Sequence, residues 1–189
     1  MMQTCCKLIF AVSLLALCWY GMMAVHEFGH VVGAWATGGT VTRLLLHPLS
    51  ISRTDVSPNP LPGVVVWLGP VVGSLLPLLP HTVMGRHRSL RNIFRFFAGF
   101  CLIANGAYIS VGSMDGIGDA GEMLRCGTPV WMLVAFGAIT VPGGLMVWHR
   151  LGSLRQFFAA ETTVTPRMVY STVIALSLLL LAEFVLLSN

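Results

Sequence analysis

The sequence carries little charge for its length. Only 10% of its 189 residues are charged, whereas 56% are hydrophobic, and the mean hydropathy is +0.81. Ordinary globular domains carry about 25% charged residues, so a soluble domain of this size would have too few polar side chains to cover its surface. The deficit excludes a typical soluble enzyme and indicates an integral, multi-pass membrane protein whose side chains mostly face lipid or other apolar helices.

Paired cysteines and a basic face are also missing. The five cysteines are odd in number and scattered, which argues against a disulfide framework. The net charge is +4, but the arginines lie in short connections between apolar runs, as expected for a multi-pass membrane protein. We therefore expect no nucleic-acid partner, and the expected partners are the lipid bilayer and other membrane proteins. No sequence signal indicates an oligomeric state.

Five apolar runs are long enough to be membrane-spanning helices. A hydrocarbon core of roughly 30 Å needs about 20 apolar residues in a helix. The runs are 8–36, 61–80, 93–113, 130–148 and 168–187. After the first run, residues 39–56 are β-branched and rich in turn formers, which predicts a short strand-like hairpin. The predicted fold is an all-α membrane protein of one domain, 1–189, with about five transmembrane helices and one hairpin.

The first run contains the sequence His26-Glu27-Phe28-Gly29-His30, with three ionisable residues among five. On a helix, His26 and His30 project from one face about a turn apart, so two imidazoles can bind one metal ion. Glu27 lies beside them and can take a proton from a water molecule at the metal. An ionisable side chain inside an apolar span costs roughly 2.5 kcal/mol or more unless it has a partner or a function. We therefore predict that this motif binds one zinc ion.

Two histidines leave a catalytic zinc short of one protein ligand, because such sites have three protein ligands and one open position. Consecutive spans alternate in direction, so the end of the first span and the segment after the third reach the same side of the membrane. That segment, 113–129, is glycine-rich, and Asp119 opens a sequence typical of a short helix, whose dipole favours a carboxylate. The candidate ligands on this side are His47, Asp55, Asp115, Asp119 and Glu122.

Polar and small residues inside the other spans are further candidates. Asn105 lies in the third run, where its amide can hold a substrate carbonyl or stabilise an oxyanion, or can hydrogen-bond between helices. Gly33 continues the face of the motif, and Gly69 and Gly73 line the second run. Small residues allow helices to approach closely, which serves packing in general or the site in particular.

These features resemble the site-2 protease family of intramembrane zinc metalloproteases, and the chain looks like a small, divergent member. The resemblance rests on the His-Glu motif, the strand-like segment after it, Leu68-Gly69-Pro70 in the second run, and an Asp-Gly-type element after the third. It covers residues 8–129, which would form the catalytic core of three spans, with two accessory transmembrane helices in 130–189. It implies that His26, His30 and one aspartate bind zinc, that Glu27 is the general base, and that the substrate is a membrane-spanning helix cut near its end.

The resemblance leaves the aspartate open between two positions. Asp115-Gly116 matches the family's Asp-Gly pair literally, although the asparagine-proline pair that precedes it in the family is missing here. The segment around Asp119, Gly118-Asp119-Ala120-Gly121, is similar to the form seen in small, divergent members. We favour Asp119 as the third ligand and keep Asp115 as the alternative.

Two other functions are compatible with the motif. One is a non-proteolytic membrane protein of the same fold that binds metal. The other is a small transporter in which His26 and Glu27 relay protons, although the inverted repeat of many transporters is not visible in the sequence. The favoured prediction is a zinc metalloendopeptidase that hydrolyses peptide bonds in or near transmembrane segments.

Overall fold

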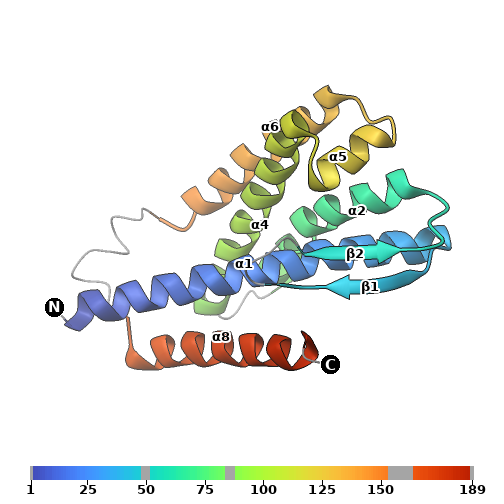
Figure 1. Cartoon of the computed structure of the whole chain (residues 1–189). Coiled ribbons are helices and arrows are strands. Elements are labelled where there is room, and N and C mark those ends of the chain that lie inside the picture. Colours follow the sequence, from blue (N-terminus) through green and yellow to red (C-terminus); the bar gives the residue numbers. More distant parts are fainter. Residues whose placement is uncertain (1, 48–51, 84–87, 153–163, 188–189) are drawn as a thin grey trace.

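The computed structural model describes residues 2–47, 52–83, 88–152 and 164–187. In this part of the chain, helices dominate and a single antiparallel pair of strands forms a hairpin (Figure 1). In chain order the elements are α1 (Met2–Thr37), β1 (Val41–Leu45), β2 (Arg53–Val56), α2 (Pro62–Leu75), α3 (Leu78–Val83), α4 (Arg88–Asp115), α5 (Gly118–Arg125), α6 (Val130–His149) and α8 (Pro166–Leu187). The predicted helical fold with one hairpin after the first helix is confirmed; the turn of the hairpin, 48–51, lies outside the described residues.

Four helical segments are long and apolar enough to cross a membrane. They are Gln3–Thr37, Pro62–Pro80, Arg91–Asp115 and Val130–His149, and they match the first four predicted runs. The fifth run forms α8, of which the apolar part with described side chains, Pro166–Leu181, is shorter than a span. A fifth transmembrane helix therefore stays a prediction.

The second apolar run is interrupted near its end. α2 stops at Leu75, and a turn at Leu76 and Pro77 separates it from the short helix α3. Pro77 has no backbone N–H to donate to the carbonyl oxygen of Gly73, so the ladder of helical hydrogen bonds is broken at this point.

α1 and α2 approach closely because small residues face each other across the contact. A Cβ atom on Gly29 would lie 2.8 Å from the Cα atom of Gly69, and one on Gly33 would lie 2.9 Å from the Cα atom of Val65. A Cβ atom on Gly69 would overlap the imidazole of His30. The small residues noted in both runs thus bring the His-Glu motif directly against the backbone of α2.

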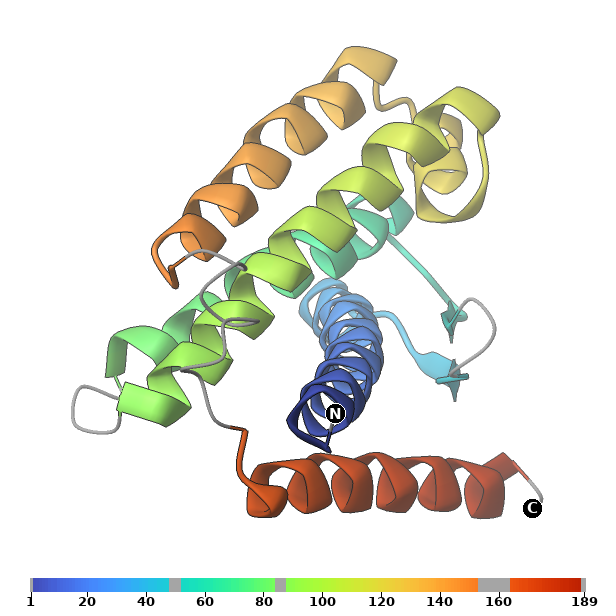
Figure 2. The same cartoon turned by 90° about the vertical axis from the view of Figure 1, so that its left-hand side faces the viewer.

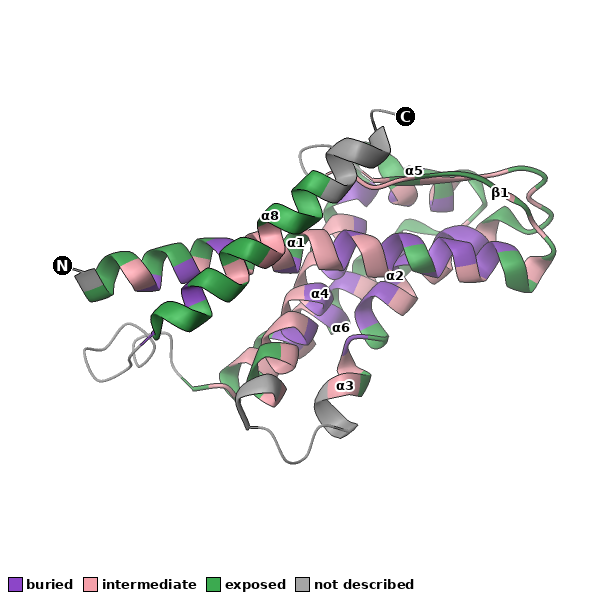
Figure 3. Ribbon diagram, turned by 90° about the horizontal axis from the view of Figure 1, so that it is seen from below, coloured by how far each residue is buried: buried purple, intermediate pink, exposed green. Residues whose placement is uncertain are grey.

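The remaining helices surround this pair. α4 packs against α1 and α2 and carries α6 along its outer side (Figure 2). α8 crosses the N-terminal half of α1, where the hydroxyl of Ser13 donates to that of Thr172 at 2.7 Å. Buried residues gather on the C-terminal half of α1 and on α2, whereas α8 is largely exposed (Figure 3). The motif therefore lies in a well-buried part of the chain that the structure describes.

We expect Gly29→Ala to force α1 and α2 apart, because the added methyl group would collide with backbone atoms of Leu68 and Gly69 that cannot rotate away. Overpacking of this kind typically costs about 1–3 kcal/mol, so purified Gly29→Ala protein should unfold at a lower temperature than wild type. Gly143→Ala in α6 is the matched control, since its Cβ would meet nothing within 4 Å. Equal destabilisation by the two substitutions would contradict the close contact between α1 and α2.

Candidate metal centre

His26, Glu27 and His30 lie in the C-terminal half of α1 and are all buried. Their exposed fractions are 6%, 3% and 6%. Ionisable groups with so little access to water need polar partners from other parts of the chain. Each of the three has such a partner, and every partner comes from a different element.

Asn105 of α4 orients the ring of His26. The Nδ1 atom of His26 donates to Oδ1 of Asn105 at 2.6 Å, and Nδ2 of Asn105 donates to the carbonyl oxygen of Cys101 at 2.9 Å. The second bond determines which way the amide faces, so Nδ1 of His26 carries a proton. Asn105 therefore acts here as the interhelical hydrogen-bonding residue, one of the two roles expected for it; contact with a substrate carbonyl or oxyanion stays a prediction.

A backbone carbonyl of α2 orients the ring of His30. The Nδ1 atom of His30 donates to the carbonyl oxygen of Val65 at 2.9 Å. Its Nε2 atom lies 3.2 Å from Nε2 of His26, and the two rings meet edge to face with their centroids 4.9 Å apart. A hydrogen bond at Nδ1 selects the tautomer that leaves Nε2 available to a metal. Both histidines thus present Nε2 to the same point.

A reversal of the chain brings α5 back over the end of α4. Gly116 and Gly118 have φ angles of +63° and +57°, a left-handed conformation that glycine adopts without a steric penalty. The backbone N–H of Asp119 then donates to the hydroxyl oxygen of Tyr108 in α4 at 3.2 Å. The reversal is what turns Asp119 toward α1.

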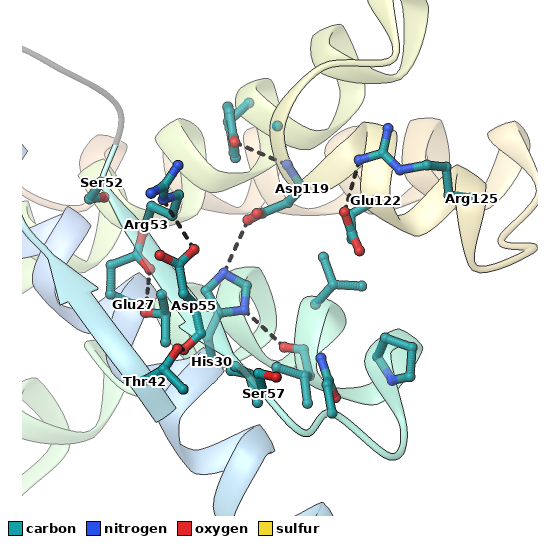
Figure 4. A pocket seen from close by; sticks show the side chains of 18 residues that line it. Glu27, His30, Thr42, Ser52, Arg53, Asp55, Ser57, Asp119, Glu122 and Arg125 are labelled. Carbon is teal, nitrogen blue, oxygen red and sulfur yellow. Dashed lines mark hydrogen bonds and ion pairs between the residues drawn. The ribbon is translucent and has the colours of Figure 1, made fainter. Parts of the chain in front are cut away.

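Asp119 completes a group of three ligand atoms. Its Oδ2 atom lies 2.6 Å from Nε2 of His26 and 3.2 Å from Nε2 of His30. Figure 4 shows Asp119 and His30 directed toward one another. One ligand atom from each of the three residues lies within 4.8 Å of the other two. This is the residue set favoured from the sequence.

The chemistry of these three atoms fits a metal ion. Both Nδ1 atoms already carry protons for other partners, so ion pairs of Asp119 with both histidines would require a second proton on each imidazole. Two imidazolium rings with their nitrogen atoms 3.2 Å apart would repel each other. A single divalent cation satisfies all three atoms at once, and two imidazole nitrogens with one carboxylate oxygen are a donor set that zinc accepts.

The contacts of Asp119 with the two histidines favour the ionised form of its carboxyl group. Burial alone raises the pKa of this carboxyl, but the hydrogen bonds with His26 and His30 outweigh burial and hold the pKa well below its usual range. Metal ligands must be deprotonated, so the environment of Asp119 suits a ligand.

The other candidate ligands lie elsewhere. Among the residues that the structure describes, only His26, His30 and Asp119 form a possible metal group. The alternative aspartate, Asp115, is exposed at the end of α4, before the chain reverses. His47 follows β1 outside the group, and the two remaining carboxylates pair with nearby arginines, Asp55 with Arg53 at 3.1 Å and Glu122 with Arg125 at 2.8 Å.

Two side chains at the site were not anticipated from the sequence. Tyr108 lies three residues after Asn105, so the two polar residues share one face of α4, and that spacing could have identified it. Thr54 of β2 donates from its hydroxyl to Oε2 of Glu27 at 2.6 Å. No spacing in the sequence relates a residue of the hairpin to a residue of α1.

A cavity of about 600 Å³ opens beside the metal group. Its walls come from α1, both strands of the hairpin, the start of α2, α4 and α5 (Figure 4). Glu27, His30 and Asp119 line it together, and charged side chains of β2 and α5 line it as well. A molecule in this cavity can therefore contact the general-base candidate and the ligand group together.

No family model, curated protein or solved structure matches this chain.

We expect one zinc ion per chain in purified wild-type protein and loss of that ion in His30→Ala and Asp119→Asn, because each change removes one ligand atom. Asp115→Asn makes the same chemical change four residues away on an exposed side chain, and it should retain zinc. Metal content after dialysis, measured by mass spectrometry, checks this. Zinc loss in Asp115→Asn with retention in Asp119→Asn would refute the assignment of the third ligand.

We expect Asn105→Ala to weaken zinc binding without abolishing it, because His26 keeps its Nε2 atom but loses the partner that orients the ring. Loss of such a partner typically lowers metal affinity about 10–100-fold. Titration against a competing chelator gives the affinity. Asn92→Ala, an exposed asparagine on the same helix, is the control and should bind zinc as wild type does.

Proposed function

We propose that this chain is a membrane-inserted zinc metalloendopeptidase, similar to the site-2 protease family, that hydrolyses peptide bonds in or near transmembrane segments of other membrane proteins. The observation that carries the proposal is the meeting of His26, His30 and Asp119 at one point with Glu27 beside them. The four helical segments that are long and apolar enough to cross a membrane support a location in the bilayer.

Each residue of the site has a definite task under this proposal. His26, His30 and Asp119 would hold one zinc ion, and their number leaves a position open for water or substrate. A bound zinc ion lowers the pKa of a water molecule from about 15.7 to about 7 and polarises a carbonyl group. Glu27 takes the proton of the attacking water and passes it to the leaving amine. Since Oε2 of Glu27 already accepts a hydrogen bond from Thr54, we assign that proton to Oε1.

The polar cavity suits an unwound stretch of a transmembrane substrate. A peptide bond within a helix is shielded until the helix opens locally, and opening leaves backbone N–H and C=O groups without partners. In lipid each such group costs several kcal/mol. The cavity offers hydroxyl, carboxylate and guanidinium groups to these atoms, and its volume lies within the usual range of ligand sites.

The described helices α6 and α8 do not line the cavity. Among the described residues, the lining comes from α1, the hairpin and its flanks, α2, α4 and α5, and none of it comes from α6 or α8. This distribution supports a catalytic core within residues 8–129 and an accessory role for 130–189.

We expect Glu27→Gln to retain zinc but to cleave a model transmembrane substrate about 10²–10⁴-fold more slowly than wild type, because the amide cannot accept the proton. Cleavage by zinc-loaded protein in liposomes, followed by the appearance of the two product fragments, measures this. Asp115→Asn is the matched carboxyl-to-amide control and should cleave at the wild-type rate. Equal cleavage by Glu27→Gln and wild type would overturn the assignment of cleavage to this site, and zinc binding without any cleavage would favour the non-proteolytic metal-binding protein.

A further inference from the structure

We propose that Thr54 is a positioning residue, and that its hydroxyl holds the carboxylate of Glu27 in the orientation needed for proton transfer. The inference rests on the proposed peptidase function. It adds a residue outside the His-Glu motif and outside the ligand group.

The contact between the two side chains is short and polar. The hydroxyl of Thr54 donates to Oε2 of Glu27 at 2.6 Å, within the range of strong hydrogen bonds to a carboxylate. Glu27 is only 3% exposed, so its carboxylate depends on protein donors for solvation. The hydroxyl group of Thr54 supplies such a donor without donating its proton fully to Glu27, so the carboxylate can still accept a proton from water.

The hydrogen bond also restricts a flexible side chain. A glutamate has three side-chain torsions, and its carboxylate can turn about the last of them over a broad range. Because Thr54 engages Oε2, the carboxylate of Glu27 is kept in one orientation with Oε1 on its other side. General-base catalysis requires the accepting oxygen within hydrogen-bond reach of the proton, so a fixed orientation increases the rate of proton transfer.

The hairpin provides a fixed support for Thr54. Thr54 pairs with Leu44 in the antiparallel register, and β2 runs beside the C-terminal half of α1 (Figure 1). Backbone hydrogen bonds tie the base of the hairpin to the end of α1, with Gly39 N–H to the Ala34 carbonyl at 2.7 Å and Ser57 N–H to the Thr40 carbonyl at 2.8 Å. The support is therefore continuous with the helix that carries Glu27.

The lengths of the two elements agree with this contact. Seven residues of helix, about 10.5 Å, separate Glu27 from Ala34. Three residues of strand, about 10 Å, separate Thr54 from Ser57 at the base of the hairpin. β2 ends at the base of the hairpin and lies along α1. The third residue back from Ser57, Thr54, therefore reaches the level of the motif.

The test compares Thr54→Val with Thr54→Ser in zinc-loaded protein, using the same liposome cleavage assay. Valine keeps the shape and strand preference of threonine but removes the donor, so we expect kcat to fall about tenfold, or about 1.4 kcal/mol, with KM and zinc content unchanged. Serine keeps the donor and should hold kcat within about threefold of wild type. Thr37→Val is the matched control, because that hydroxyl bonds carbonyl groups of its own helix, and it should act as wild type.

A double variant separates positioning from general damage to the fold. If Thr54 acts through Glu27, then Glu27→Gln with Thr54→Val should be no slower than Glu27→Gln alone. Additive losses, a loss of zinc in Thr54→Val, or a rise in KM with kcat unchanged would each overturn the inference. If wild type is active and Thr54→Val has the same kcat, the role of Thr54 is rejected while the proposed peptidase function stands. A zinc-loaded wild type that cuts nothing removes the proposed function, and the role of Thr54 with it.

Discussion

The burial of three ionisable side chains within one apolar helix is the constraint on which the rest of the structure depends. His26, Glu27 and His30 are each less than 10% exposed, so each must find its polar partners inside the protein. Four separate elements supply them: α4 through Asn105, α2 through the Val65 carbonyl, α5 through Asp119 and the hairpin through Thr54. The arrangement of these elements around α1 follows from the need to satisfy that one segment.

Close packing is what makes those partners available. A backbone carbonyl of α2 can reach His30 only because Gly69 and Gly29 let the two helices touch, and Gly73 makes the same room for Asn105. A larger side chain at any of these positions would separate a donor from its acceptor by more than hydrogen bonds tolerate. The close packing of the helices and the hydrogen bonds of the buried polar groups therefore both depend on these glycines.

The same hydrogen bonds that satisfy the histidines also give them the orientation that the proposed metal site needs. Each Nδ1 atom is engaged by a fixed acceptor, so both Nε2 atoms are directed at Asp119. In the part of the chain that the structure describes, His30 and Asp119 of this group also line a polar cavity. An enclosed ligand group beside an open polar cavity is the combination that the proposed hydrolysis of a peptide bond requires, since the substrate must enter and the ligands must not move.

Much of the architecture was already determined by the amino-acid sequence. Apolar runs predicted the helices, and β-branched residues predicted the hairpin, because these are local preferences of the chain. The spacing of four between His26 and His30 determined that two imidazoles share a face. Asp119 was favoured over Asp115 from a resemblance of the surrounding residues, whereas its position beside the histidines depends on the reversal of the chain at Gly116 and Gly118, which is a tertiary event. The contacts of His30 with a carbonyl and of Glu27 with Thr54 were decided by tertiary structure alone. A carbonyl group is the same at every position, and residues on separate elements meet only through packing, so neither contact leaves a pattern in the sequence.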